Sequence, residues 1–159
     1  MWTQIDSPVG PLRLVEHRDT LTAVEFAPFG AGDGRPRGGR DDDQPVLVEA
    51  ARQLYAYFDR ELTVFDLPLA PQGTDFQQRV WEQLRGIAFG ETASYGEIAR
   101  RLGMTNAASR AVGLANGRNP IPIIIPCHRV IGADGTLTGY AGGLERKQLL
   151  LSLETDALF

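Results

Sequence analysis

The sequence contains few of the residues on which several classes of protein depend. Of its 159 residues, one is a cysteine, two are histidines and one is a lysine. With the single cysteine, Cys127, the chain can form no internal disulfide and no zinc cluster built on cysteines. No apolar run approaches the ~18 residues of a membrane span, and the N-terminus lacks the basic and apolar regions of a signal peptide. We therefore expect a cytoplasmic protein.

The residues that are present are typical of a globular chain. Hydrophobic residues make up 43% of the sequence and charged residues 23%, which excludes a wholly disordered chain. A folded chain of this length buries roughly 70% of the surface that it exposes when unfolded, enough for a core of its own. The length fits one ordinary domain or two small ones.

The net charge of −4 is unevenly distributed along the chain. Residues 1–72 carry 7 basic and 12 acidic side chains, whereas residues 79–129 carry seven arginines and three glutamates. A negative net charge argues against a polyanionic partner. The local excess of +4 nevertheless permits one, because the forked guanidinium of arginine suits phosphates and base edges.

The first part of the chain has the pattern of a small α+β domain. Alternating and β-branched residues over 5–15 and 21–26 predict an antiparallel meander. Residues 30–44 are rich in glycine, aspartate and arginine, and we expect a mobile loop there. Apolar residues at helical spacing over 45–60 predict a helix, and an extended segment over 62–72 follows it.

The pattern changes to helices at Gly73, where we place a domain boundary between 1–72 and 73–159. Helices are predicted over 74–84, 95–102 and 107–116. The last two are short and joined by a turn, which is typical of a helix-turn-helix, although other helical hairpins share the pattern. Arg110 is the one long cationic side chain on the last helix, whose many small residues allow close approach to a neighbouring helix or a DNA groove.

An apolar segment leads to the single cysteine. Residues 121–125 are apolar and β-branched and predict a buried strand, which Pro122 and Pro126 confine to an edge. Cys127 follows where this strand ends, beside His128 and an arginine, a setting that lowers the pKa of a thiol. The alternative is an inert buried cysteine at the end of the core.

The segment Pro126-Cys-His-Arg-Val130 resembles the active-site signature of the methylated-DNA–protein-cysteine methyltransferases, the O6-alkylguanine-DNA alkyltransferase family. Other motifs resemble this family in its order: Thr74-Asp-Phe-Gln-Gln-Arg-Val-Trp81, Gly90-Glu-Thr-Ala-Ser-Tyr-Gly-Glu-Ile-Ala99, Arg110-Ala-Val-Gly113, Asn119-Pro120 and Gly139-Tyr-Ala-Gly-Gly143. The resemblance covers 73–154, and 7–12 more loosely resembles the family's N-terminal domain. It implies a ribonuclease-H-like N-terminal domain and a C-terminal winged helix-turn-helix domain.

The resemblance implies a suicide enzyme of DNA repair. Cys127 would take the methyl group from O6-methylguanine, and from O4-methylthymine, in double-stranded DNA, and the thioether formed cannot be hydrolysed. His128 would remove the thiol proton through a water, oriented by Glu154. The Tyr95 hydroxyl would donate to the purine, and Asn119 would hold the turn before the cysteine segment.

The resemblance also implies that the damaged nucleotide is flipped out and that the DNA is bound through its minor groove. Arg110 would fill the vacated stack. The DNA-binding residues implied are Arg110, Tyr95, Ser94, Ala107, Ala108, Gly113 and Arg129. The base pocket implied is formed by Pro122, Val130, Tyr140, Ala141 and Gly142. We expect no cofactor, no metal ion and a monomer, and leave cooperative binding along DNA open.

Two functions of other classes are also compatible with these residues. The first is a winged-helix module that binds DNA lesions and carries an inert cysteine. The second is a hydrolase that uses Cys127 and His128 on small esters or peptides.

Overall fold

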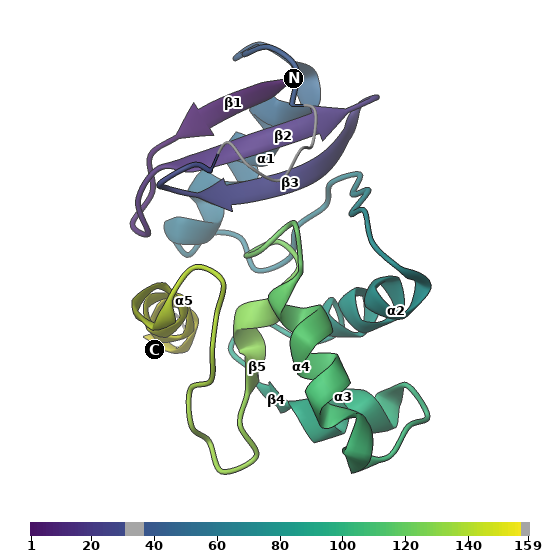
Figure 1. Ribbon diagram of the computed structural model, residues 1–159. Coiled ribbons are helices and arrows are strands. Elements are labelled where there is room, and N and C mark those ends of the chain that lie inside the picture. Colours follow the sequence, from purple (N-terminus) through teal and green to yellow (C-terminus); the bar gives the residue numbers. More distant parts are fainter. Residues whose placement is uncertain (31–36, 157–159) are drawn as a thin grey trace. The chain divides into compact units, whose positions relative to one another are not determined.

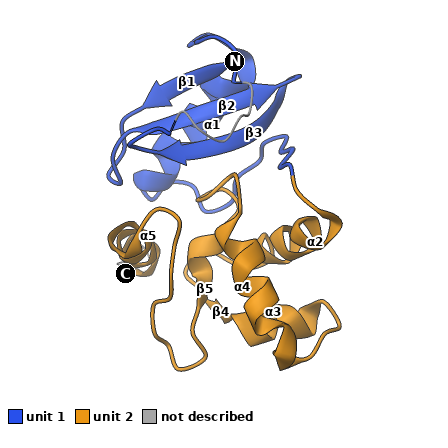
Figure 2. Ribbon diagram, in the orientation of Figure 1, with its two compact units in different colours: residues 1–72 blue, residues 73–159 orange. Residues whose placement is uncertain are grey.

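The computed structural model describes residues 1–30 and 37–156. Residues 31–36, which belong to the loop predicted over 30–44, lie outside the described residues. The chain divides into two compact units, residues 1–72 and 73–159 (Figure 2). Each unit has buried apolar side chains of its own.

Unit 1 is a three-stranded antiparallel sheet with a helix against one face (Figure 1). Its elements are β1 (Trp2–Ile5), β2 (Leu12–His17), β3 (Thr20–Phe26) and α1 (Pro45–Phe58), with the strands in the order β1-β2-β3. Leu12 and Leu14 alternate along β2 and are fully buried, as their period of two requires. The helix packs against all three strands. The predicted meander and helix are thus confirmed.

Part of the predicted mobile loop is fixed in place. The Trp2 N–H donates to the Gly39 carbonyl over 3.0 Å, and the Asp41 N–H donates to the Trp2 carbonyl over 2.9 Å. The Arg37 guanidinium pairs with Glu25 at 2.6 Å. These contacts join residues 37–44 to the sheet, which composition alone did not indicate.

Unit 2 contains the helix-turn-helix and the cysteine. Its elements are α2 (Asp75–Leu84), β4 (Ala93–Ser94), α3 (Tyr95–Arg101), the 3₁₀ helix η1 (Asn106–Ala108), α4 (Ser109–Gly117), the 3₁₀ helix η2 (Cys127–Arg129), β5 (Val130–Ile131) and α5 (Leu144–Asp156). Helix α4 packs against α2 and α3, and β4 pairs in parallel with β5. The α-helix α4 begins two residues later than predicted, because its first turn is the separate 3₁₀ helix η1.

The predicted strand over 121–125 is wrong, although the segment is buried. It is a tight turn in which the Ile125 N–H donates to the Ile121 carbonyl over 2.9 Å. The Asn119 side chain joins both ends, since its Oδ1 accepts from the Ile121 N–H at 3.0 Å and its Nδ2 donates to the Ile125 carbonyl at 2.8 Å. Ile123 has a φ of 73°, which is unfavourable for a β-branched residue. The prolines in and after the segment have no N–H for a strand ladder.

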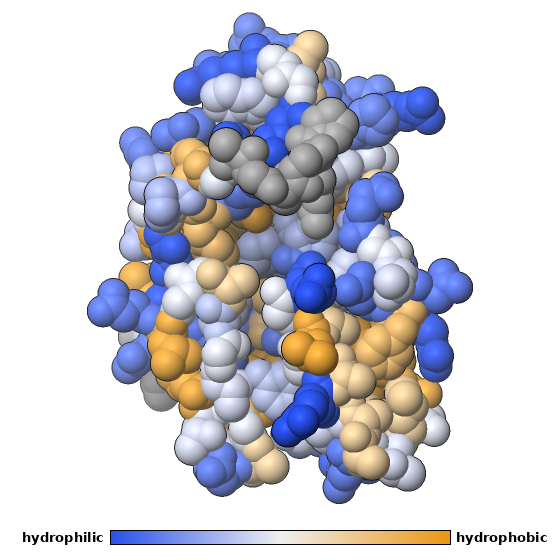
Figure 3. All heavy atoms as spheres, in the orientation of Figure 1, coloured by the Kyte–Doolittle hydropathy of each residue, from blue (hydrophilic) through white to orange (hydrophobic). Residues whose placement is uncertain are grey.

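On the face of the molecule shown in Figure 3, hydrophilic and hydrophobic side chains are interspersed. Scattered apolar residues are normal on protein surfaces. In the two ranges that the structure describes, no helix is long and apolar enough to cross a membrane.

We predict that the capping box at the start of α2 stabilises the fold. Thr74 Oγ1 accepts from the Gln77 N–H at 3.2 Å, and Gln77 Oε1 accepts from the Thr74 N–H at 2.9 Å. Thr74→Ala should lower the free energy of unfolding by about 1 kcal/mol, measured by urea denaturation. The control is Thr105→Ala, because Thr105 precedes η1 without a capping bond from its side chain. An equal loss in both variants would contradict the prediction.

Candidate active site

Cys127 lies in η2, just after the turn over 121–125 that the Asn119 side chain closes, and only 4% of its surface is exposed. Its carbonyl accepts from the Asn116 Nδ2 at 3.3 Å. Burial raises the pKa of the Cys127 thiol to about 11, although hydrogen bonds with Asn119 and Tyr140 and the charge of Lys147 act in the opposite direction. The expectation of a lowered thiol pKa is therefore corrected: desolvation outweighs the nearby cation. At neutral pH the thiol is protonated, so its reaction requires a base.

His128, the residue after Cys127, forms a buried pair with Glu154, in which His128 Nε2 lies 2.6 Å from Glu154 Oε2. Burial alone would raise the pKa of Glu154, but hydrogen bonds from His128 and Arg129 outweigh it and lower the pKa to about 2. The carboxylate accepts, so Nε2 carries the proton and Nδ1 has a free lone pair. Burial lowers the pKa of His128, which keeps the ring neutral. Nδ1 is buried and has no hydrogen-bond partner among the described residues. A neutral imidazole in this state can accept a proton.

Arg129 is buried and donates to the carboxylate of this pair. Its Nε donates to Glu154 Oε1 at 2.8 Å and its Nη2 to Glu154 Oε2 at 3.0 Å. Its Nη1 donates to the Ile87 carbonyl at 2.6 Å. The side chain is 7% exposed. This position does not suit the DNA contact that the resemblance implied, and we assign Arg129 instead to holding Glu154.

Tyr95 lies at the start of α3 and reaches two other parts of unit 2. Its hydroxyl shares a hydrogen bond with Thr138 Oγ1. Its ring lies over Gly113 of α4, where an added Cβ would be 3.6 Å from the ring. Ser94 caps α3 by accepting from the Glu97 N–H at 3.1 Å. The start of α3 therefore places Tyr95 beside the face of α4 that carries Gly113.

Lys147 of α5 is fully buried, and the sequence analysis did not place it in the site. Its Nζ donates to the Val130 carbonyl at 2.6 Å and to the Thr138 carbonyl at 3.3 Å. Burial lowers the pKa of Lys147, and the nearby cysteine partly opposes this. The one lysine of the chain shares the buried face of α5 with Leu150 and Glu154, at the i, i+3, i+7 spacing that indicates a core face. This spacing is the feature of the sequence that could have indicated the burial of Lys147.

The other predicted residues divide between interior and surface. Val130 and Pro122 are buried, Tyr140 and Gly142 are partly exposed, and Ala141 is exposed. On the helix-turn-helix, Arg110 and Ala107 are exposed, and Ala108 is partly exposed. Within the part of the chain that is described, no three His, Cys, Asp or Glu side chains gather as metal ligands would.

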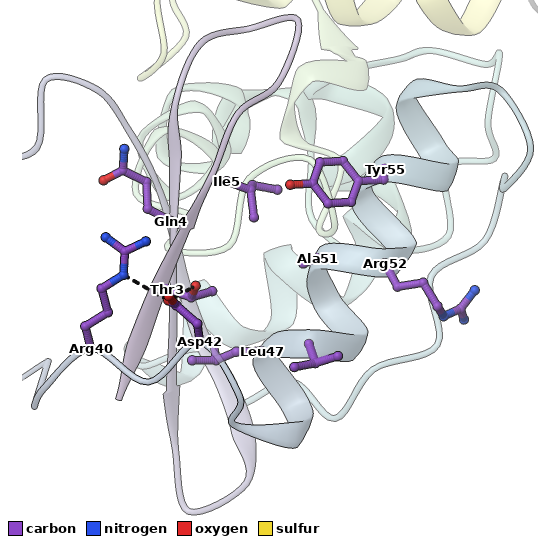
Figure 4. A pocket seen from close by; sticks show the side chains of 10 residues that line it. Thr3, Gln4, Ile5, Arg40, Asp42, Leu47, Ala51, Arg52 and Tyr55 are labelled. Carbon is purple, nitrogen blue, oxygen red and sulfur yellow. Dashed lines mark hydrogen bonds and ion pairs between the residues drawn. The ribbon is translucent and has the colours of Figure 1, made fainter.

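A hollow of about 440 Å³ in unit 1 is a weaker candidate (Figure 4). It is lined by Thr3, Gln4, Ile5, Arg40, Asp42, Leu47, Val48, Ala51, Arg52 and Tyr55. Arg40 pairs with Asp42 at 2.9 Å, and Arg52 pairs with Glu49 at 2.5 Å. Its charged groups thus have partners within the chain, and none of the lining side chains is a nucleophilic cysteine or a basic histidine. We therefore place the chemistry at Cys127.

Two models of known protein domains match the chain. Residues 75–156 match the model of the 6-O-methylguanine DNA methyltransferase DNA binding domain, and residues 1–71 match that of the ribonuclease-like domain. The chain belongs to the 6-O-methylguanine DNA methyltransferase family. The predicted fold class, an α+β chain with a ribonuclease-H-like first domain and a helix-turn-helix second domain, is confirmed.

Relatives of this methyltransferase family match most of the chain. The methylated-DNA–protein-cysteine methyltransferase of Mycobacterium bovis is 55% identical over 150 residues, which are 94% of this chain and 89% of that protein. The one of Methanosarcina acetivorans is 52% identical over 94% of both chains. Mycobacterium tuberculosis OGT, crystallised in complex with DNA, is 51% identical, with a TM-score of 0.85 over 98% of this chain and 93% of its own.

We predict that Glu154 links stability to pH. Its folded pKa of about 2 lies below its ordinary value of 4.5. The ionised pair therefore stabilises the fold above pH 4.5, and this stabilisation is lost as the pH falls towards 2. Glu154→Gln should lower the free energy of unfolding at pH 7 by about 3 kcal/mol, because it leaves Arg129 buried without its charge partner.

The measurement is chemical denaturation from neutral to acid pH. The difference in stability between the wild type and Glu154→Gln should shrink as the pH falls through this window. Glu145→Gln, which alters an exposed glutamate of the same helix, is the matched control and should follow the wild type. A gap that stays constant with pH would show that the charge of Glu154 does not stabilise the fold.

Proposed function

We propose that this protein repairs DNA by direct reversal, moving the methyl group of O6-methylguanine in double-stranded DNA irreversibly onto its own Cys127. O4-methylthymine, which presents a methyl group on an equivalent oxygen, is the second substrate. The observation that carries the proposal is the buried series of Cys127, His128 and Glu154 within a helix-turn-helix unit. Family membership and a DNA-bound relative support it.

The proton moves first. His128 Nδ1 takes the thiol proton of Cys127 through a water, and Glu154 stabilises the imidazolium that forms. The thiolate then attacks the methyl carbon in line with the C–O6 bond, so a C–S bond forms as the C–O bond breaks. The buried ammonium of Lys147 favours the thiolate, since its charge lowers the pKa of Cys127. The electron pair of the broken bond goes to the purine.

Negative charge on the leaving purine is then stabilised by hydrogen bonds. The Tyr95 hydroxyl, which shares a hydrogen bond with Thr138 in the free protein, exchanges this partner for the base. The Ala141 N–H faces O6. The carbonyls of Cys127 and Val130 accept from the exocyclic amine. The Val130 carbonyl accepts from Lys147 Nζ and has a second lone pair, whereas the Cys127 carbonyl already accepts from Asn116 Nδ2 and the Val130 N–H and exchanges one of these donors for the base.

The base reaches the thiol only when it leaves the duplex, since Cys127 is almost completely buried. Arg110 is exposed on α4 and fills the space in the base stack. The small residues Ala107, Ala108 and Gly113 allow this surface to enter the minor groove. The product is a thioether, which has no hydrolysable acyl bond, so each molecule acts once. The cytoplasmic location stays a prediction from the sequence.

We predict that incubation with duplex DNA containing O6-methylguanine adds the mass of a single methyl group to the protein. Intact mass spectrometry followed by peptide mapping should place it on Cys127. Cys127→Ser should remain unmodified, because a hydroxyl is far less acidic than a thiol. The same duplex without the methyl group is the control.

The alternative functions give different results in this experiment. Tight DNA binding with an unchanged mass would indicate a lesion-binding module instead. Repeated turnover of a small ester, lost in Cys127→Ser, would indicate a hydrolase. Either result would overturn the proposed methyl transfer.

We also predict that Arg110→Ala separates repair in DNA from the chemistry. Repair of the methylated duplex should fall by about tenfold or more, because the vacated stack is left unfilled. Reaction with free O6-methylguanine should stay within about twofold of the wild type, because the thiol and its base are untouched. Both rates follow from the methylated fraction of the protein over time.

The matched control is Arg85→Ala, which removes the same charge from an exposed position in unit 2. It should leave both rates close to those of the wild type. A parallel loss of both reactions in Arg110→Ala would show that Arg110 supports the active site and not nucleotide flipping.

A further inference from the structure

Thr138 lies in the segment 132–143, which joins β5 to α5 (Figure 1), and two other elements of unit 2 hold it there. Its carbonyl accepts from Lys147 Nζ of α5 at 3.3 Å. Its side-chain Oγ1 shares a hydrogen bond with the Tyr95 hydroxyl at the start of α3. The side chain is partly exposed, so it does not belong to the buried core. The threonine therefore joins α3 and α5 through polar contacts.

These contacts place Thr138 among the groups that the proposed reaction uses. Lys147, which holds its carbonyl, also donates to the Val130 carbonyl at 2.6 Å. Tyr95 and Val130 are two of the proposed contacts of the base. Ala141, whose N–H is a third, follows Thr138 by three residues. The side chain of Thr138 thus reaches the group that donates to the leaving purine.

The hydroxyls of Thr138 and Tyr95 can act in series. Each has one proton, and each oxygen can also accept. Either oxygen can be the donor in the hydrogen bond that they share. When Tyr95 turns its proton to the base, Thr138 loses that proton as a partner, and its own proton can then point at the phenolic oxygen. Hydrogen bonds in a chain polarise one another, so Tyr95 becomes a stronger donor when its oxygen accepts.

We propose that Thr138 is a positioning residue for the departure of the purine, whose hydroxyl donates to the oxygen of Tyr95 while Tyr95 donates to the base. This inference rests on the proposed function. The electron pair of the broken C–O6 bond goes to the purine, and the two hydroxyls in series stabilise the charge that forms there. Both hydroxyls keep their protons. Thr138 acts through Tyr95 and makes no bond to the reacting atoms.

The test replaces Thr138 by valine, which is also β-branched but has no hydroxyl. Thr138→Val should slow methyl transfer from free O6-methylguanine by about fivefold, the equivalent of one hydrogen bond. Thr138→Ser keeps the hydroxyl and should stay within about twofold of the wild type. The matched control is Thr136→Val, because Thr136 belongs to the same segment and its Oγ1 donates to Asp134 at 2.7 Å. It should react like the wild type, and all rates follow from the methylated fraction over time.

Iodomethane separates the leaving group from the thiol. It presents the same methyl carbon to Cys127, but iodide is a stable anion that leaves without a hydrogen bond from Tyr95. The C–S bond forms as the C–I bond breaks, the electron pair leaves with iodide, and the thiol proton goes to His128. Thr138→Val should therefore be methylated on Cys127 within about twofold of the wild-type rate, measured by peptide mapping. A purely structural role of Thr138 would slow both reactions alike.

A double-mutant cycle tests whether the effect passes through Tyr95. Tyr95→Phe removes the phenolic hydroxyl and should slow transfer from O6-methylguanine more than Thr138→Val does, because the donor to the base is lost. When Tyr95→Phe is already present, Thr138→Val should change the rate by less than about twofold, since no phenolic oxygen remains for the threonine to contact.

Each outcome decides the inference. It is overturned by a wild-type rate in Thr138→Val, by an equal loss with iodomethane, by a loss that Thr138→Ser shares, or by additive effects in the cycle. In all these cases the wild type still transfers the methyl group, so the proposed function stands. If the wild type takes no methyl group from O6-methylguanine, free or in a duplex, while iodomethane methylates Cys127, the proposed function fails and the inference fails with it.

Discussion

One buried carboxylate, that of Glu154, joins the parts on which the site depends. Its two oxygens accept from His128 and Arg129, and Arg129 also donates to the Ile87 carbonyl in the turn after α2. The end of α5, the cysteine segment and this turn thus meet at a single charge. A buried carboxylate is tolerable only when such bonds satisfy it. The same bonds fix the proton on Nε2 of His128. Glu154 therefore fulfils its structural and its chemical role through one set of hydrogen bonds.

The thiol itself is kept unreactive by its surroundings. Burial raises the pKa of Cys127 to about 11, more than the charge of Lys147 and the neighbouring hydrogen bonds can offset. On the proposed function, this suits a protein that can act only once, because a standing thiolate would be lost to other electrophiles. Reactivity then comes from His128, whose neutral ring is ready to accept the proton as soon as a substrate is in place.

The sequence predicted what depends on local patterns and missed what depends on distant partners. Strand alternation and helix spacing are local, so the meander and the helices over 45–60, 74–84, 95–102 and 107–116 were predicted within a few residues, whereas α5 was not among the predicted helices. The segment 121–125 has the composition of a strand, and only the two hydrogen bonds of Asn119 make it a turn. The burial of Arg129 depends on Glu154, 25 residues away, and no local pattern shows it. Glu154 itself was found through the family resemblance, since an isolated glutamate on a helix is usually solvated.

The charge distribution explains how an acidic protein can bind a polyanion. The excess of negative charge lies in residues 1–72, whereas residues 79–129 carry a net +4. At physiological salt the field of an exposed charge fades within about 8 Å, so DNA on the surface of α4 responds chiefly to the charges on and next to that helix. The helix-turn-helix carries one carboxylate, Glu97 in the first turn of α3, and no acidic residue follows it from 98 to 133, so α4 and the cysteine segment carry none. The net charge of a whole chain therefore says little about its partner when the element that binds the partner has a different net charge.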